Sequence, residues 1–92
     1  MSAKEMWNNA YKNTEMSNSK VEEDEKTINY HLEQKVSGYK TCYGITFNKE
    51  NKSYHTYCYG WNDKGEPFDS NWSIDINLNN IINKQIEELG WK

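Results

Sequence analysis

Two hydrophobic periods divide this chain into a helical start, a sheet and a helical end. Near the N-terminus, apolar residues from Ala3 to Tyr11 recur three and four positions apart, which is the spacing of an amphipathic helix. Ser2 and Glu5 add the capping-box pattern, in which a hydroxyl and a carboxylate satisfy backbone N–H groups at the start of a helix. The pattern predicts a helix over residues 1–12.

Residues 13–27 are polar and show no hydrophobic period. They contain a run of four acidic residues, Glu22, Glu23, Asp24 and Glu25. A run of like charges is typical of a solvated segment, so we interpret residues 13–27 as a polar acidic linker. A helical turn around Val21 is the alternative interpretation.

From Ile28 onward the period changes to two, which is the spacing of half-buried strands. The alternation predicts strands over residues 28–36, 39–47, 53–61 and 72–76. Polar reversals separate these strands at Ser37-Gly38, at 48–52 and at 62–67, where the chain has its only proline. The central part of the chain is therefore expected to form a sheet over residues 28–76.

The last segment has the clearest helical pattern. Its stripe consists of Leu78, Ile81, Ile82, Gln85, Ile86 and Leu89. Gly90 follows the stripe where a C-terminal cap belongs, and Asn77 precedes it as an N-cap candidate, so we predict a helix over 78–89. The whole order predicts a single α+β domain over residues 1–92, a four-stranded antiparallel sheet with the N-terminal and C-terminal helices packed on one face.

The pairing of the second and third predicted strands decides where the aromatic side chains lie, because a slip of one residue exchanges the two faces of a strand. If the reversal at 48–52 has an odd number of residues, Cys42 faces Cys58 and the large rings share one face. We expect this register, because burying one continuous aromatic face at about 25 cal/mol per Å² outweighs the turn preference. In the even register, rings of the third strand turn outward, and an exposed Tyr and Trp patch marks a partner site or a dimer interface.

Two cysteines and two histidines are the candidates for metal binding, Cys42, Cys58, His31 and His55. Their spacing contains no C-x-x-C or H-x-x-x-H pair, and His55 and Cys58 are expected on opposite faces of a strand. No serine or cysteine lies in a motif for nucleophilic catalysis. The sequence therefore predicts no metal, no cofactor and no catalytic residue, and it predicts reduced cysteines in a cytoplasmic protein.

Composition and charge narrow the choice of partners. The 92 residues carry a formal net charge of −3, and 14% of them are aromatic. The basic residues are all lysine, so the guanidinium fork that dominates nucleic-acid readout is missing, and no segment supplies a basic groove. The N-terminus does not have the pattern of a signal peptide, and no apolar run approaches the about 20 residues that span a bilayer. A protein partner in the cytoplasm is therefore expected, and neither nucleic acid nor a membrane.

The resulting hypothesis is a small non-catalytic binding protein that inhibits a larger basic protein that handles nucleic acids. Phage anti-defence proteins (anti-CRISPR or anti-restriction) and toxin-immunity proteins have this combination of short length, acidity and missing catalytic motif. Acidic residues steer association, while tyrosine and tryptophan supply contact area. The residues expected at the interface are Glu22, Glu23, Asp24, Glu25, Tyr54, Tyr59, Trp61, Glu87 and Glu88. The alternative is a self-associating structural or adaptor domain, such as a homodimer that pairs through its open sheet face; a Cys/His metal-binding protein is a more remote alternative.

Overall fold

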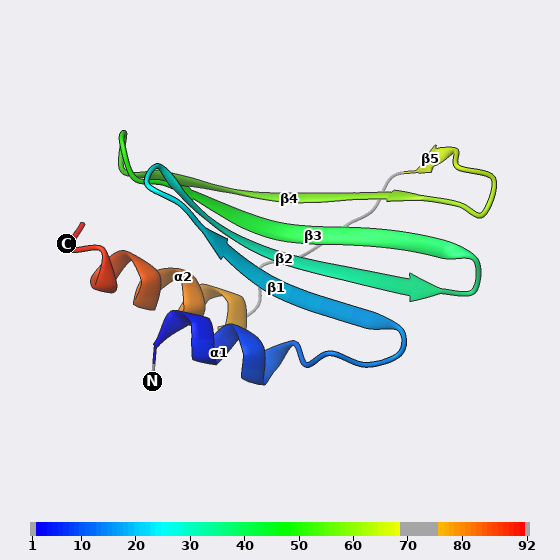
Figure 1. Ribbon diagram of the computed structural model, residues 1–92, viewed down its shortest axis with the longest axis horizontal. Helices are drawn as coiled ribbons and strands as arrows, with labels where there is room; N and C mark the ends of the chain where they lie inside the picture. The colour runs from blue at the N-terminus through cyan, green and yellow to red at the C-terminus, as the bar shows by residue number, and fades with distance from the viewer. Residues whose placement is uncertain (1, 69–75, 92) are drawn as a thin grey trace.

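The strands of this chain form one antiparallel sheet in which each strand lies beside the strand that follows it in the sequence. The computed structural model describes residues 2–68 and 76–91 (Figure 1). Both helices lie on the same face of the sheet, which confirms the α+β class with a helix near each end of the chain. The elements in chain order are α1 (Ala3–Ala10), β1 (Ser17–Glu23), β2 (Thr27–Val36), β3 (Tyr39–Asn48), β4 (Ser53–Trp61), β5 (Pro67–Phe68) and α2 (Ile76–Glu88).

The first strand lies within the segment interpreted as a linker, so that interpretation was wrong for residues 17–23. β1 is an edge strand, and all seven of its residues pair with β2, from Ser17 opposite Gln34 to Glu23 opposite Ile28. Its helix-facing positions are polar apart from Val21, so the hydrophobic pattern carried no strand signal. The backbone ladder with β2, and not apolar alternation, defines this strand.

The end of the predicted fourth strand was also wrong. Ile76 is the first residue of α2, and Asn77 lies inside that helix and not at its N-cap. Trp72 and Ile74, the other members of that predicted strand, lie outside the described residues. Ile76 is 75% exposed and does not belong to the buried stripe of α2. Its two-residue spacing from Ile74 therefore resembled a strand pattern by coincidence.

The helix caps and the core follow the sequence pattern. The Ser2 hydroxyl accepts a hydrogen bond from the backbone N–H of Glu5, and Gly90 takes the positive φ of +72° that a C-terminal cap requires. The α2 stripe is buried from Leu78 to Gln85. The core between helices and sheet consists of Ala3, Trp7, Ile28, Tyr30, Leu32, Ile45, Phe47, Leu78, Ile81 and Ile82.

One buried polar pair joins the sheet to α2. The Tyr30 hydroxyl donates a hydrogen bond to the side-chain oxygen of Gln85, and both residues are almost fully buried. This pair explains why a glutamine lies in an otherwise apolar stripe, because a buried hydroxyl left without a partner costs about 1–3 kcal/mol. Burial raises the pKa of Tyr30, so the hydroxyl stays protonated and donates.

The register between β3 and β4 is the even one, so the odd register that we expected was wrong. Asn48 pairs with Ser53 across a four-residue turn, Tyr43 pairs with Cys58, and Cys42 pairs with Tyr59. The turn decides the register, because the Asn48 side-chain oxygen accepts hydrogen bonds from two backbone N–H groups inside the turn, at 3.0 and 3.3 Å. The consequence is that the large side chains of β4 point away from the helices.

Candidate functional site

The sheet face opposite the helices, called the open face below, carries a row of three aromatic side chains from β4. This aromatic row consists of Tyr57, Tyr59 and Trp61. The Tyr57 and Tyr59 ring centroids are 5.8 Å apart and the rings are 22° from parallel, while Tyr59 and Trp61 meet edge to face at 5.2 Å. The Lys40 amino group lies 6.0 Å from the centre of the Trp61 ring, within reach of a cation–π interaction. Tyr59 remains 42% exposed, so the row presents ring surface to solvent.

Gly44 allows the first member of the row to lie flat on the sheet. Gly44 is the direct partner of Tyr57, and a Cβ atom at Gly44 would lie 2.1 Å from the Tyr57 ring and hydroxyl. The ring therefore crosses β3 and reaches β2, where its hydroxyl lies 2.8 Å from Nδ1 of His31 and 3.2 Å from the side-chain oxygen of Asn29. An aromatic ring that covers a cross-strand glycine in this way pins the strand register.

The hydrogen bonds around Tyr57 bear on the tautomer of His31, and burial bears on its charge. The Asn29 oxygen accepts from the Thr46 hydroxyl at 3.0 Å and from the Tyr57 hydroxyl. When the Tyr57 proton is donated to Asn29, the Tyr57 oxygen can accept from Nδ1–H of His31, and this tautomer leaves the lone pair on Nε2. Burial lowers the pKa of His31, with a smaller contribution from the charge of Lys20, so the ring is neutral at pH 7.

Replacing Gly44 with alanine is expected to destabilise the domain by about 1–3 kcal/mol, because the added methyl group overlaps the Tyr57 ring. Urea denaturation measures this loss. In a Tyr57→Ala background the same replacement should cost less, although part of the cost persists because the Tyr30 carbonyl lies 2.5 Å from the added atom. Equal costs in the two backgrounds would show that Tyr57 does not rest on Gly44.

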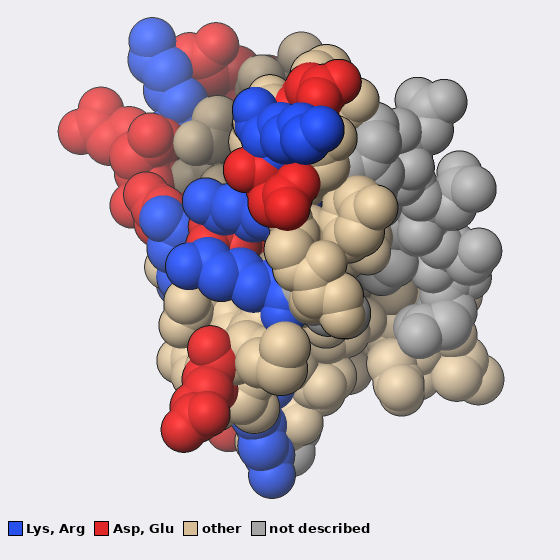
Figure 2. Space-filling model, turned by 90° about the vertical axis from the view of Figure 1, so that its right-hand side faces the viewer, with Lys and Arg blue, Asp and Glu red and all other residues tan. Residues whose placement is uncertain are grey.

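The acidic residues gather at one end of the molecule. In Figure 1 the β1–β2 turn and the last turn of α2 lie at the same end, and the Glu88 carboxylate accepts a hydrogen bond from the Ala3 N–H at 2.6 Å. All the acids of these two segments are exposed, and four of them, Glu22, Glu25, Glu87 and Glu88, are called the acidic end below. Glu22 lies 3.0 Å from the Lys20 amino group and Glu87 lies 3.9 Å from that of Lys84, both at the surface. At the opposite end, where β2 turns into β3, lysine and acidic side chains are interspersed (Figure 2).

Two members of the acidic run have structural roles. The Glu23 carboxylate contacts the amino groups of Lys4 at 2.5 Å and Lys49 at 2.7 Å, and these contacts lower the pKa of Glu23. The Asp24 carboxylate accepts from the backbone N–H groups of Thr27 and Lys26, which closes the β1–β2 turn and lowers the pKa of Asp24. Only part of the run is therefore available to attract a partner.

The remaining predicted interface residues divide between the two faces. Tyr59 and Trp61 belong to the aromatic row, whereas Tyr54 lies on the helix side of β4 with its ring 5.7 Å from that of Phe47. Sequence reasoning missed the network around Tyr57 and His31. The Ser37-Gly38 turn was a signal for the β2 and β3 part of the network, because a two-residue turn fixes the register of these strands and places His31 opposite Gly44. The position of Tyr57 depends on the β3–β4 register.

The four candidate metal ligands of the sequence do not form one cluster. Cys42 and Cys58 are unpaired thiols on opposite faces of the sheet, and Cys42 is the more deeply buried. His55 is exposed opposite Thr46. Of the four, His31 and Cys42 are close together on the open face.

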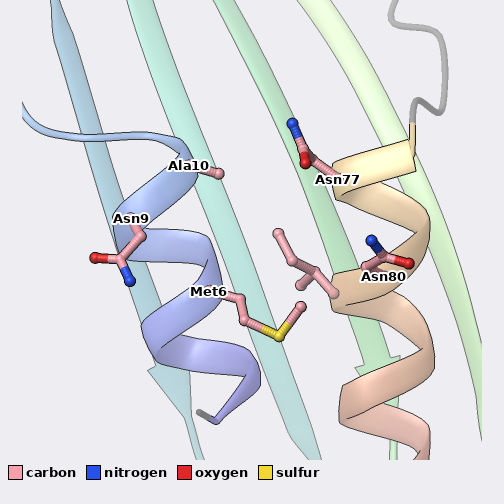
Figure 3. Close-up of a pocket in the computed structure, with 6 residues that line it drawn as sticks. Met6, Asn9, Ala10, Asn77 and Asn80 are labelled. Atoms are coloured by element: carbon pink, nitrogen blue, oxygen red, sulfur yellow. The ribbon is translucent and has the colours of Figure 1, made fainter.

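A groove of about 330 Å³ lies between the two helices (Figure 3). Met6 and Ile81 contribute apolar surface, and Asn9, Asn77 and Asn80 line the groove from both helices. Its lining in the described part of the chain contains no charged residue, so the groove has no acid–base pair that could catalyse a reaction.

Neither α1 nor α2 has the length and apolar composition needed to cross a bilayer. Comparisons of the chain with protein family models, with curated proteins and with solved structures give no match. The candidate site therefore rests on the geometry of the open face and of the acidic end.

Proposed function

We propose that this chain is a non-catalytic protein inhibitor that docks on a larger basic protein through the aromatic row and the acidic end. The observation that carries this proposal is the aromatic row on a sheet face opposite both helices. Tyrosine and tryptophan give large contact areas for little loss of side-chain entropy, and they are enriched at the centres of protein interfaces. The Tyr57 network holds the row in place before a partner arrives, which lowers the ordering cost of binding.

The class of partner follows from charge. Glu22 lies on the open face together with the row, and Glu25, Glu87 and Glu88 extend the negative charge around the end of the molecule. A basic surface, such as that of a nuclease or another nucleic-acid-handling enzyme, is complementary to this arrangement. We place the protein among phage anti-defence proteins, of the anti-CRISPR or anti-restriction type, or toxin-immunity proteins, and in the cytoplasm where their targets act.

Capture followed by an activity assay tests the function. The immobilised chain is exposed to a cell extract of its host, the retained protein is identified, and its activity is measured with and without the purified chain. The expected result is one basic nucleic-acid-handling protein that is retained at low salt, released as salt rises, and inhibited when bound. A retained protein whose activity is unchanged by the chain would contradict the inhibitor proposal.

Reversing the charge of Glu22 and Glu25 to lysine is expected to slow association with the captured partner by about tenfold at low salt, with a smaller effect on dissociation. These two residues are chosen because Glu23 and Asp24 hold the fold. Glu15→Lys with Glu66→Lys is the matched control, since both are exposed acids in loops at the opposite end. Surface plasmon resonance measures the two rates, and equal slowing by both pairs would remove the steering role of the acidic end.

Self-association through a sheet edge is a second candidate function. β5 pairs with β4 only at Gly60 and Trp61, so within the described residues Ser53 to Tyr59 of β4 form an edge without a partner strand. Such an edge is a template for pairing with another chain. Sedimentation equilibrium over a range of concentrations separates the two functions, because a stable dimer supports the adaptor alternative and a monomer supports the inhibitor.

A further inference from the structure

Three different ligand types converge on the open face between β2 and β3. A ring nitrogen of His31, a carboxylate oxygen of Glu33 and the sulfur of Cys42 all lie within 4.8 Å of one another. The register produces this cluster, because Glu33 is the direct partner of Cys42 and His31 precedes Glu33 by two residues on the same face. Two hydrogen-bonded strands are a rigid frame, so the three groups are brought together by the fold and not by side-chain flexibility.

Two tyrosines next to the cluster, Tyr57 and Tyr59, lie where residues that orient metal ligands are usually found. Metal-binding histidines usually donate the N–H of their second nitrogen to a neighbouring acceptor, which fixes the ring and its tautomer. Here Nδ1 of His31 bonds to the Tyr57 hydroxyl, which leaves Nε2 with its lone pair. Tyr59 is the direct cross-strand partner of Cys42, on the same face of the sheet.

Glu33 supplies the negative charge of the cluster. Glu33 is half-buried with its carboxylate 3.4 Å from the Lys40 amino group. Lys40 already lies close to the Trp61 ring and can remain there if a cation takes its place beside Glu33.

We propose that His31, Glu33 and Cys42 bind one zinc ion, with the fourth coordination position open. Nitrogen, oxygen and sulfur ligands together match the borderline softness of Zn²⁺, and sites with three protein ligands leave a position for water. This site departs from the expectation drawn from sequence spacing, because Glu33 was not among the candidates. It is independent of the proposed docking function, which needs no metal.

Cobalt titration of the purified full chain tests the site, because Co²⁺ replaces Zn²⁺ and reports a thiolate ligand through its charge-transfer absorption. We expect one Co²⁺ per chain, a thiolate band, and displacement by Zn²⁺. Cys42→Ser should remove the band, and Glu33→Gln should weaken binding by more than about 100-fold, since even outer-shell changes cost about 10–100-fold. Cys58→Ser and His55→Asn are matched controls outside the cluster and should leave the titration unchanged.

Tyr57→Phe separates a metal site from a merely structural cluster. Loss of the hydroxyl should weaken Co²⁺ binding by about 10–100-fold while the thiolate band persists at saturation, because the ligands themselves remain. Circular dichroism shows whether each variant is folded. If Cys42→Ser does not fold, the Co²⁺ affinity of Glu33→Gln tests the site in its place. Absence of a thiolate band in the wild-type chain, or a band lost in Cys58→Ser and kept in Cys42→Ser, would overturn the proposal.

Discussion

Replacing Ile82 with aspartate is expected to unfold the domain. Ile82 is 2% exposed and belongs to the α2 stripe that packs on the sheet. Losing its side chain costs about 2–5 kcal/mol, and placing an unpaired carboxylate in the core adds several kcal/mol more. A 92-residue domain has a total stability of only about 5–14 kcal/mol, so the sum is comparable with the whole.

Asn83→Asp is the matched control, because it introduces the same residue at the next position of α2, where the side chain is exposed. We expect Asn83→Asp to melt within a few degrees of the wild type and Ile82→Asp to show no cooperative transition in circular dichroism. If Ile82→Asp keeps a native melting curve, α2 does not bury the face described for it.

Replacing Tyr59 with alanine is expected to weaken partner binding by at least about 30-fold. Tyr59 is the central member of the aromatic row, 42% exposed, with ring contacts to both of its neighbours. Truncating an aromatic hot spot at the centre of an interface typically costs about 2 kcal/mol or more, which corresponds to that factor. Isothermal titration calorimetry with the captured partner, in the presence of a chelator, measures the change without any contribution from a metal.

Tyr54→Ala is the control, since Tyr54 is the same residue type on the same strand and is 44% exposed, but lies on the helix side. Its replacement removes a ring contact with Phe47 and should lower stability, while binding by the folded fraction stays within about twofold of wild type. Equal losses of affinity in both variants would show that the row is not the docking surface.

The two proposals share a face but fail separately. Glu33→Gln tests the zinc site at a residue outside the aromatic row, and Trp61 can be changed without touching His31, Glu33 or Cys42. A chain that binds Co²⁺ but no protein partner supports the metal site and contradicts the inhibitor proposal. A chain that inhibits its target but gives no thiolate band with Co²⁺ supports the inhibitor proposal and contradicts the metal site.

The elements that depend on a single strong hydrophobic period were predictable from the order of residues alone. The stripe of α2, the Ser2 cap of α1 and the alternation in β2, β3 and β4 all correspond to observed elements, because burial of one face imposes these spacings locally. The Ser37-Gly38 turn was also readable, since glycine supplies positive φ without steric cost.

The tertiary structure decided β1, the β3–β4 register and the cluster at Cys42. An edge strand such as β1 is defined by backbone pairing, which leaves no mark on hydrophobic spacing. The register of β4 depends on whether the turn after Asn48 has an odd or an even number of residues. The hydrogen bonds of the Asn48 side chain favour the four-residue turn, and they outweigh the free energy that burying all the rings on one face would give. The aromatic row follows from the β3–β4 pairing, whose parity no local pattern shows. The β2–β3 pairing behind the three-ligand cluster was implied by the Ser37-Gly38 turn, but no spacing along the chain marks His31, Glu33 and Cys42 as a ligand set.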